Sequence, residues 1–373
     1  MEHAQEIALL EELQGLKEQG LFFLDDDIVQ ENVATYGPQR FAVEKKLFQK
    51  LPRPVALSSE LSNPGDYLAR DMGNLPLLLT RDDTGQVNAF LNVCRHRGAR
   101  LTPDGTGCAT RFTCPYHAWT YSNSGELRAV PHQKTGFPDL EKTAHGLTRL
   151  PVRERAGMIW AAGDAKADME AAAPLDADFA WMGLPEMAIV SSEDITLKAN
   201  WKLLIEGGLE AYHFKVAHKK TIGPHFLDNL SSYARIGRHL RSVLPRTSLP
   251  QLEGTPRESW RLRDHANVLY TCLPIGQFLV MQDHVAWIDA EPLAHDQTRL
   301  RLRLLAPKDT GSAEHWARNH AITKTTLMED FELNEAQQAG LMSGAQTHLT
   351  FGRYEGALAA FNAGVNKLLQ SID

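Results

Sequence analysis

Cysteine is scarce in this sequence, with four residues in a chain of 373. Proteins that depend on a disulfide scaffold carry a far higher density of cysteine, so this class is excluded. The first stretch, MEHAQEIALLEELQGLKEQG, lacks the basic start and apolar centre of a secretory signal. We interpret it as an amphipathic helix that ends at Gly20. These absences predict a cytoplasmic protein whose thiols stay reduced.

Long apolar runs and excess positive charge are also missing. No run of about eighteen apolar residues occurs, so the sequence predicts no membrane span. The net charge of −7 argues against nucleic acid or an anionic membrane as a partner. We find no phosphate-binding loop, no G-x-G-x-x-G motif after a strand and no convincing Ser-His-Asp arrangement.

Strand-like segments dominate the part of the chain from about residue 40 to 160. LPLLLT and QVNAFLNV flank the turn-like RDDTG and predict a β-hairpin. The segment after this part of the chain, GDAKADMEAAAPLDADFAWMG (163–183), is rich in Ala, Asp and Pro, and we interpret it as a linker or a loosely packed surface segment. The sequence therefore predicts a small all-β domain over 40–160.

The C-terminal part mixes strands with long helices. NWKLLIEGGLEAYHF predicts a helix capped by Asn200, although its two central glycines weaken it. TRLRLRLLAP alternates arginine and leucine, as a strand with one wet face does. The end of the chain, from about residue 315, is mostly helical. This order of elements predicts an α+β protein in which long helices grip a sheet.

Two short motifs bring thiols and imidazoles together. CRHRGA contains Cys94 and His96, and CPYHAW contains Cys114 and His117. Zinc fingers usually pair their first two ligands as C-x-x-C, whereas here each motif offers one thiolate and one imidazole. A Rieske 2Fe–2S cluster needs two cysteines on one iron and two histidines on the other. The spacing favours that cluster over a zinc site and leaves Cys108, between the motifs, without a partner.

A second set of possible ligands follows in EGGLEAYHFKVAH. It contains Glu210, His213 and His218 in the pattern E-x-x-H-x-x-x-x-H. Residues five apart on a regular helix point about 140° away from each other, so both imidazoles reach one ion only if the helix bulges or ends. Two histidines and one carboxylate form the facial triad of non-haem Fe(II) oxygenases. Alone, such a histidine pair is more often structural.

The motifs together resemble a known family. CRHRGA and CPYHAW look like the Rieske domains of ring-hydroxylating-type oxygenases, and NWKLLIEGGLEAYHFKVAH is similar to the catalytic segment of Rieske non-haem iron oxygenase α subunits. The resemblance implies an α+β fold with an all-β Rieske domain over 40–160. It also implies a helix-grip catalytic domain with an antiparallel sheet over 161–373, on which the N-terminal helical segment 1–39 packs.

The resemblance also implies ligands for two metal centres. It assigns the 2Fe–2S cluster to Cys94, His96, Cys114 and His117, and the mononuclear iron to His213, His218 and Asp330. Asp330 stands where the family's ED helix motif carries the ligating aspartate, with three neighbouring acids that spacing does not exclude: Glu329, Glu332 and Glu335. Glu210 is implied to bridge His213 to His117 of a neighbouring subunit.

Several positions depart from the family's usual pattern. Ala118 replaces a glycine after CPYH, and Gly207 replaces an asparagine near the iron. Glu210 stands where most relatives have aspartate, and glutamate occurs there in some oxygenases of quaternary ammonium compounds. Five residues are candidates to line a substrate pocket: Phe214, Tyr270, Phe278, His284 and Trp287.

The function that the resemblance implies is that of a terminal oxygenase. It would use O₂ and electrons from a separate NAD(P)H-dependent reductase or ferredoxin to hydroxylate, dihydroxylate or oxidatively demethylate a small organic substrate of aromatic or quaternary-ammonium type. The two centres of one chain are too far apart in this family for rapid electron transfer, which implies a closed ring, most simply a homotrimer. The alternative is a Rieske electron carrier or binding protein with an inactive C-terminal domain.

Overall fold

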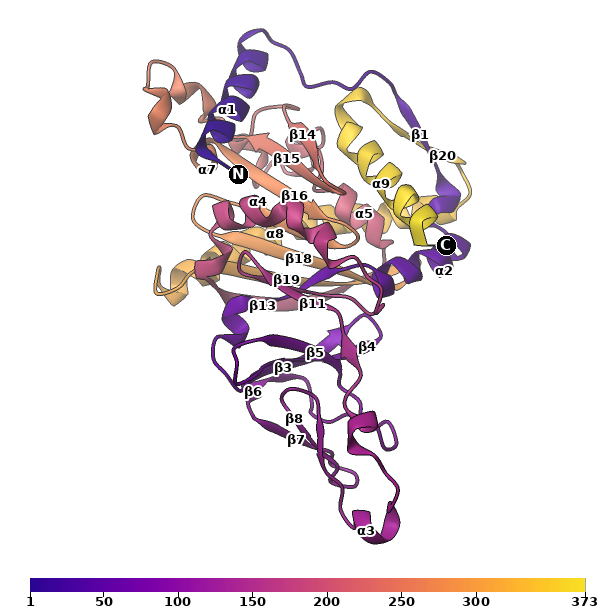
Figure 1. The fold of residues 1–373 in the computed structure, drawn as a ribbon. Coiled ribbons are helices and arrows are strands. Elements are labelled where there is room, and N and C mark those ends of the chain that lie inside the picture. Colours follow the sequence, from indigo (N-terminus) through magenta and orange to yellow (C-terminus); the bar gives the residue numbers. More distant parts are fainter. Residues whose placement is uncertain (373) are drawn as a thin grey trace. The chain divides into compact units, whose positions relative to one another are not determined.

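The computed structural model describes residues 1–372. The chain divides into two compact units (Figure 1). One unit comprises Gln49–Asp176 and Leu184–Glu186, and the other comprises the N-terminal Met1–Phe48, the short Ala177–Gly183 and the chain from Met187 onward. The domain ranges expected from the sequence, 1–39, 40–160 and 161–373, remain a prediction. Residues 40–48 fall in the same unit as the C-terminal half.

The unit built on Gln49–Asp176 consists mainly of three antiparallel sheets. Its five-stranded sheet runs in the order β10 (Arg149–Leu150), β5 (Val87–Leu91), β4 (Leu75–Arg81), β3 (Asp66–Met72) and β6 (Gly105–Cys108). The two three-stranded sheets are β11 (Val152–Arg155), β12 (Met158–Ala161) and β2 (Arg53–Leu57), and β7 (Arg111–Thr113), β8 (Thr120–Ser122) and β9 (Leu127–Ala129). Strands β4 and β5 form the hairpin predicted around RDDTG.

Short helical turns connect these strands. They are η2 (Ser58–Leu61), α3 (Gln133–Gly136), η3 (Lys142–His145), η4 (Met169–Leu175) and η5 (Leu184–Glu186). The segment expected to be a linker is helical instead, since η4 is followed by α4 (Asp176–Met182), whose Phe179 and Met182 are buried. The linker prediction is wrong because these apolar side chains, dispersed among Ala and Asp, give a weak periodic signal.

The second unit is centred on a seven-stranded antiparallel sheet. Its order is β13 (Met187–Leu197), β19 (Gln297–Pro307), β18 (Val285–Ala294), β17 (Gly276–Val280), β16 (Ala266–Cys272), β15 (His239–Pro245) and β14 (Ser232–Ile236). The Arg–Leu alternation correctly predicts the strand β19, where Leu300, Leu302 and Leu304 are buried. The expected wet face is wrong at Arg303, which is buried over the ring of Trp287.

Helices cover this sheet and lead into the site. The longest, α8 (Ala313–Met342), packs Trp316, Leu327 and Phe331 against the leucines of β19. The others are α1 (His3–Glu18), α2 (Pro38–Lys50), α5 (Trp201–Glu206), α6 (Phe214–Ala217), α7 (Leu262–His265) and α9 (Gly356–Ile372), with the turns η1 (Val33–Tyr36), η6 (Gly223–His225), η7 (Leu249–Leu252), η8 (Arg257–Ser259) and η9 (Arg353–Glu355). A two-stranded sheet pairs β1 (Val29–Asn32) with β20 (His348–Phe351). The predicted α+β class is confirmed.

Two further expectations concern the helices. Helix α1 ends as predicted, with Gly20 at φ +64° just beyond it, the left-handed conformation that glycine adopts without a Cβ clash. Among residues 1–372, no helix is both long and apolar enough to cross a membrane.

Candidate metal centres

The two histidines of the second motif lie at opposite ends of a single helical turn. Helix α5 ends at Glu206, so the predicted helix is wrong beyond Gly207, where the two glycines stop it. The chain then turns, and the short α6 begins after His213 and ends before His218. This break removes the 140° divergence of a regular helix. The imidazole centroids are 5.1 Å apart.

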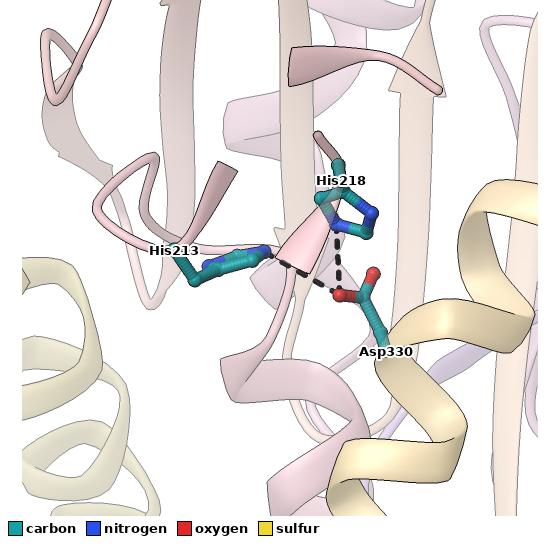
Figure 2. A group of neighbouring side chains, drawn as sticks. All are labelled: His213, His218 and Asp330. Atoms are coloured by element: carbon teal, nitrogen blue, oxygen red, sulfur yellow. Dashed lines mark ion pairs between the residues drawn. The ribbon is translucent and has the colours of Figure 1, made fainter. Parts of the chain in front are cut away.

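Asp330 reaches this histidine pair from α8 (Figure 2). Its Oδ1 lies 2.9 Å from Nε2 of His218 and 3.4 Å from Nε2 of His213. Within the described residues, these three side chains are the set that brings three possible ligand atoms within 4.8 Å of one another. Two imidazoles and one carboxylate in this arrangement suit a non-haem iron with open positions for other ligands.

The three competing acids of α8 are placed differently. Glu329 accepts a hydrogen bond from Nδ1 of His218 at 2.7 Å, on the side of the ring away from Asp330. Glu332 is exposed, and Glu335 accepts from the backbone N–H of Lys198 at 2.8 Å. Glu329 therefore orients a histidine rather than joining the triad, in the way that carboxylates commonly support metal-bound histidines. Spacing alone did not reveal this role.

Electrostatics at the triad favour bound positive charge. Desolvation lowers the pKa of His213, but hydrogen bonds with Asp330 and Glu210 outweigh it and raise the pKa to about 10. Desolvation likewise opposes the ionised form of Asp330, and the two histidines reverse this and hold its pKa below the usual range. The carboxylates thus stabilise positive charge between the rings, which a divalent metal ion can supply when it displaces the protons of the histidines.

Glu210 lies against His213 and is largely buried. One carboxylate oxygen contacts Nδ1 of His213, and the other accepts from the backbone N–H groups of Tyr212 and His213. With Nδ1 held in this way, Nε2 of His213 is left facing Asp330. Glu210 therefore fixes the orientation of one histidine of the triad.

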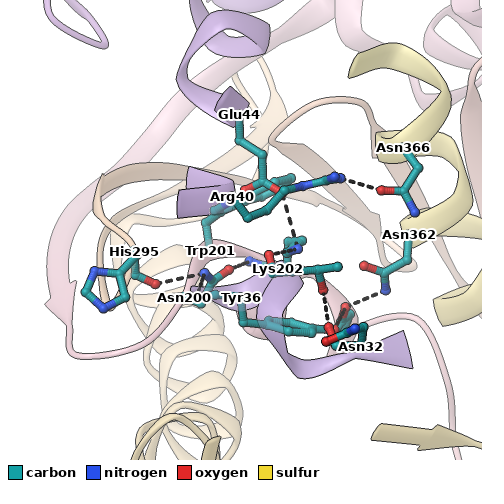
Figure 3. Close-up of polar contacts among 12 residues, drawn as sticks. Asn32, Tyr36, Arg40, Glu44, Asn200, Trp201, Lys202, His295, Asn362 and Asn366 are labelled. Atoms are coloured by element: carbon teal, nitrogen blue, oxygen red, sulfur yellow. Dashed lines mark hydrogen bonds and ion pairs between the residues drawn. The ribbon is translucent and has the colours of Figure 1, made fainter. Parts of the chain in front are cut away.

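A buried polar network anchors α5, the element that leads into the triad (Figure 3). Asn200 caps the helix as predicted, accepting from the Lys202 backbone N–H at 2.9 Å and donating to the Tyr36 carbonyl at 3.1 Å. The buried ammonium of Lys202 pairs with Glu44 at 3.2 Å. The Tyr36 hydroxyl donates to Glu206 at 2.7 Å. Because removing one partner of a buried pair costs about 3–5 kcal/mol, these contacts hold α5 firmly in place.

Two cavities border the triad. A cavity of about 370 Å³ has a mixed lining that includes Glu206, Glu210 and His213 beside several leucines, and an apolar one of about 80 Å³ is lined by His218 and Phe214; Gly207 and Asp330 line both. The absence of a side chain at position 207 thus keeps space open beside the triad.

Most of the aromatic residues expected at a pocket lie elsewhere. Phe214 lines the apolar cavity. Phe278 stacks on Trp287 and contacts Phe179 of α4, and the Tyr270 hydroxyl donates to Asp178. Together with His284, which contacts Trp316, they are absent from the lining of both cavities. The pocket prediction was wrong for these four residues because they belong to other contacts of the core.

The two cysteine–histidine loops have the same backbone conformation. In one, Gly98 donates to the Cys94 carbonyl at 3.0 Å; in the other, Ala118 donates to the Cys114 carbonyl, also at 3.0 Å. Both donors are left-handed, with φ of +76° and +56°. The alanine thus adopts the conformation that the family's glycine favours, at a cost of about 1–2 kcal/mol.

The side chains on these loops fit a two-iron cluster. Both cysteines are buried, and the imidazoles of His96 and His117 lie 4.7 Å apart, centroid to centroid. The Nδ1 atoms of both histidines are buried without a hydrogen-bond partner among the described residues, which leaves them available as ligands. Desolvation, with the charges of His117 and Arg97, lowers the pKa of His96 and favours the neutral, metal-binding form. Cys108 is exposed on β6, outside both loops.

Comparison with known proteins agrees with this geometry. Residues 52–150 match the family model described as "Rieske [2Fe-2S] domain", and residues 184–371 match "Ring hydroxylating alpha subunit (catalytic domain)". The oxygenase subunit of glycine betaine monooxygenase from Chromohalobacter salexigens is 34% identical over 52% of this chain and 43% of its own length. The large oxygenase component of a naphthalene 1,2-dioxygenase system from Ralstonia sp. is 35% identical over 44% of this chain and 38% of its length. These matches thus span about two fifths of either relative.

Solved structures share the fold over nearly the whole chain. The quaternary ammonium Rieske monooxygenase CntA with L-carnitine superposes with a TM-score of 0.79 at 22% identity, covering 94% of this chain and 98% of that one. Naphthalene 1,2-dioxygenase from Rhodococcus sp. gives 0.76 at 19% identity, covering 98% of both chains. These likenesses establish the fold, and the family models imply a Rieske cluster and a mononuclear iron. The chain belongs to the family of ring-hydroxylating oxygenase α subunits, with a Rieske domain ahead of the catalytic domain.

Proposed function

We propose that this chain is the oxygenase component of a Rieske-type system. It hydroxylates, dihydroxylates or oxidatively demethylates a small organic substrate, with O₂ as co-substrate and electrons from a separate NAD(P)H-dependent reductase or ferredoxin. The observation that carries the proposal is the triad of His213, His218 and Asp330 bordering a cavity in a chain that also has a Rieske domain. The cytoplasmic location expected from the sequence belongs to the same proposal.

The residues of the chain have defined tasks in this proposal. Cys94, Cys114, His96 and His117 hold the cluster, and His213, His218 and Asp330 hold the mononuclear iron. When bound, the cluster supplies single electrons and the iron activates O₂. The chain itself orients the histidines, through Glu210 on one and Glu329 on the other. It also keeps water from the apolar side of the site, which leucine and phenylalanine side chains line.

We further propose a homotrimeric ring in which electrons cross between subunits. Glu210, already in contact with His213, would accept a hydrogen bond from His117 of the partner subunit. The carboxylate would then connect the two centres through a continuous path of hydrogen bonds.

The hydroxyl of Tyr121 is expected to tune the cluster, a role that no sequence motif indicated. It accepts from the Arg95 N–H at 3.0 Å and lies 3.4 Å from Sγ of Cys94, to which it can donate. Such a donor stabilises the more negative, reduced cluster. With one hydrogen bond at about 0.5–1.5 kcal/mol, Tyr121→Phe should lower the reduction potential by about 20–65 mV. Redox titration followed by visible spectra measures this; an unchanged potential would contradict the assignment.

A substrate screen tests the proposed function. The purified protein, loaded with iron and supplied with a surrogate reductase and NAD(P)H, is incubated with aromatic and quaternary-ammonium compounds. Product masses should show the gain of one or two oxygen atoms or the loss of a methyl group. A protein that carries only the two cluster irons and forms no product would instead be the electron carrier with an inactive C-terminal domain.

A further inference from the structure

The apolar cavity beside the triad has a floor made by the large sheet. Leu269 and Leu279 are register partners on β16 and β17 and both line the cavity. Two residues further along lies the next register pair on the same face of the sheet, Thr271 and Gln277. The floor is therefore apolar in the middle and carries the Gln277 amide at one end.

The orientation of the Gln277 amide is fixed by its neighbours. Gln277 is 2% exposed. Its Nε2 donates to the Ile205 carbonyl at 3.0 Å and to Oγ1 of Thr271 at 3.1 Å, so both of its N–H groups are used. An amide oxygen has two lone pairs, and Oε1 of Gln277 accepts no hydrogen bond within residues 1–372. At this end, the cavity offers an acceptor that needs a donor.

The opposite end of the floor carries a second amide with the reverse polarity. Asn267 lies four residues before Thr271 on β16, roughly 13 Å along the strand. Its Oδ1 accepts from Nε and Nη2 of Arg246 at 3.1 and 2.5 Å. Because a guanidinium only donates, Nδ2 of Asn267 remains as the donor of this side chain.

The remaining lining sets the charge and size of an occupant. Among the described residues that line the cavity, the one acid is Asp330, which is already paired with His213 and His218, and no tryptophan or tyrosine is present. A quaternary ammonium ion is held most strongly by the face of tryptophan or by a free carboxylate, and the aromatic faces that the cavity offers are those of Phe214, Phe226 and Phe331. The volume of about 80 Å³ is about half of the roughly 150 Å³ of an engineered cavity that holds benzene, so even a single ring requires the lining side chains to move, and a fused ring system is too large.

We propose that the substrate is a neutral, mainly apolar molecule, no larger than a single ring, whose O–H or N–H group donates to Oε1 of Gln277. This rests on the proposed function, in which the cavity beside the triad receives the substrate. This substrate class differs from the quaternary ammonium compounds suggested by glutamate at position 210 and by the relatives that act on such compounds. A quaternary ammonium ion has no N–H to give, so it would leave the buried Gln277 oxygen unpaired.

Calorimetric binding to the anaerobic, iron-loaded protein without reductase tests the proposal. The probes are phenol, toluene and tetramethylammonium, which are of similar size and differ in donor and charge. We expect phenol to bind about 2- to 13-fold more tightly than toluene, the value of one hydrogen bond, and tetramethylammonium to bind most weakly. Tetramethylammonium binding as tightly as phenol, or no preference for phenol over toluene, would overturn the proposal.

Two variants locate the effect. In Gln277→Met, phenol and toluene should bind equally, whereas Leu279→Met should change both affinities alike and keep their ratio. A phenol preference that survives in Gln277→Met overturns the role of this residue. The wild-type comparison stands even if a variant fails to fold. Binding is measured without turnover. If the affinities follow the expected order but no oxygenated product forms in the turnover assay, the proposed function alone is contradicted. Turnover of a quaternary ammonium compound without phenol binding contradicts this proposal alone.

Discussion

Replacing Asp330 with alanine is expected to remove the mononuclear iron and to lower product formation by more than about 100-fold. The carboxylate is the group that lies against Nε2 of both His213 and His218, and two imidazoles alone make an incomplete facial site. Loss of residues that merely support metal ligands costs about 10–100-fold, so the loss of a ligand should exceed this. Iron content should fall from three to two atoms per chain, while the visible spectrum of the cluster stays unchanged.

Two neighbours on the same helix serve as controls for Asp330→Ala. Glu332 is exposed, so Glu332→Ala should keep full iron and activity. Glu329 holds Nδ1 of His218 and the Thr221 hydroxyl, so Glu329→Ala should weaken iron affinity by about 10–100-fold without abolishing binding. Full iron in Asp330→Ala, or greater iron loss in Glu329→Ala, would show that the third ligand was assigned wrongly.

Local sequence rules predict the start of the helix that precedes the two histidines but not its end. Asn200 was identified as the cap because its side-chain oxygen can accept from the first free N–H groups of a helix, and the structure shows this bond. The glycines at 207 and 208 were known to weaken the helix, but propensity does not say whether the helix bends or ends. Long-range contacts such as the buried pair of Lys202 with Glu44 also fix α5, and local propensity does not contain them.

Residue alternation did not identify the pocket. Neighbouring residues of a strand point to opposite faces, and nearly all residues of β16 and β17 are buried, so hydrophobic patterning fits either face. Leu269 lines the cavity, whereas the next residue, Tyr270, bonds to Asp178. Which face receives the triad depends on where α8 crosses the sheet, and that contact joins residues far apart in sequence.

The choice of Asp330 as the proposed third ligand likewise could not be made from local sequence alone. Four acids within one stretch of α8 have nearly equal sequence signals, and a resemblance singled out Asp330. In the structure, the rotation of α8 places Asp330 and Glu329 around His218 and leaves Glu332 in solvent. Helical rotation is set by packing of Phe331 and Leu327 on the sheet, which spacing within the helix does not report.

Replacing Glu210 with glutamine is expected to abolish product formation, with a loss of about 100-fold or more, while both metal centres stay occupied. Glutamine keeps the size of the side chain but removes the charge that holds Nδ1 of His213 and would accept from His117 of the partner subunit. Product formation with reductase is compared with iron content and the cluster spectrum. Glu355→Gln is the matched control, since Glu355 lines the same cavity and bonds to the Gly352 N–H of its own turn. Normal turnover in Glu210→Gln would exclude electron transfer through Glu210.

Loss of electron transfer in Glu210→Gln can be distinguished from damage to the iron site by changing the electron source. Hydrogen peroxide brings oxygen and two electrons together, so that a C–H bond and peroxide give an alcohol and water. It should restore product in Glu210→Gln but not in Asp330→Ala.

Co-expression of His117→Ala with Asp330→Ala then tests whether electrons pass within one chain or between subunits. Neither variant has both centres in one chain, so activity of the mixed assembly, absent from either variant alone, requires electrons to pass between subunits. An inactive mixed assembly would place the whole path within one chain.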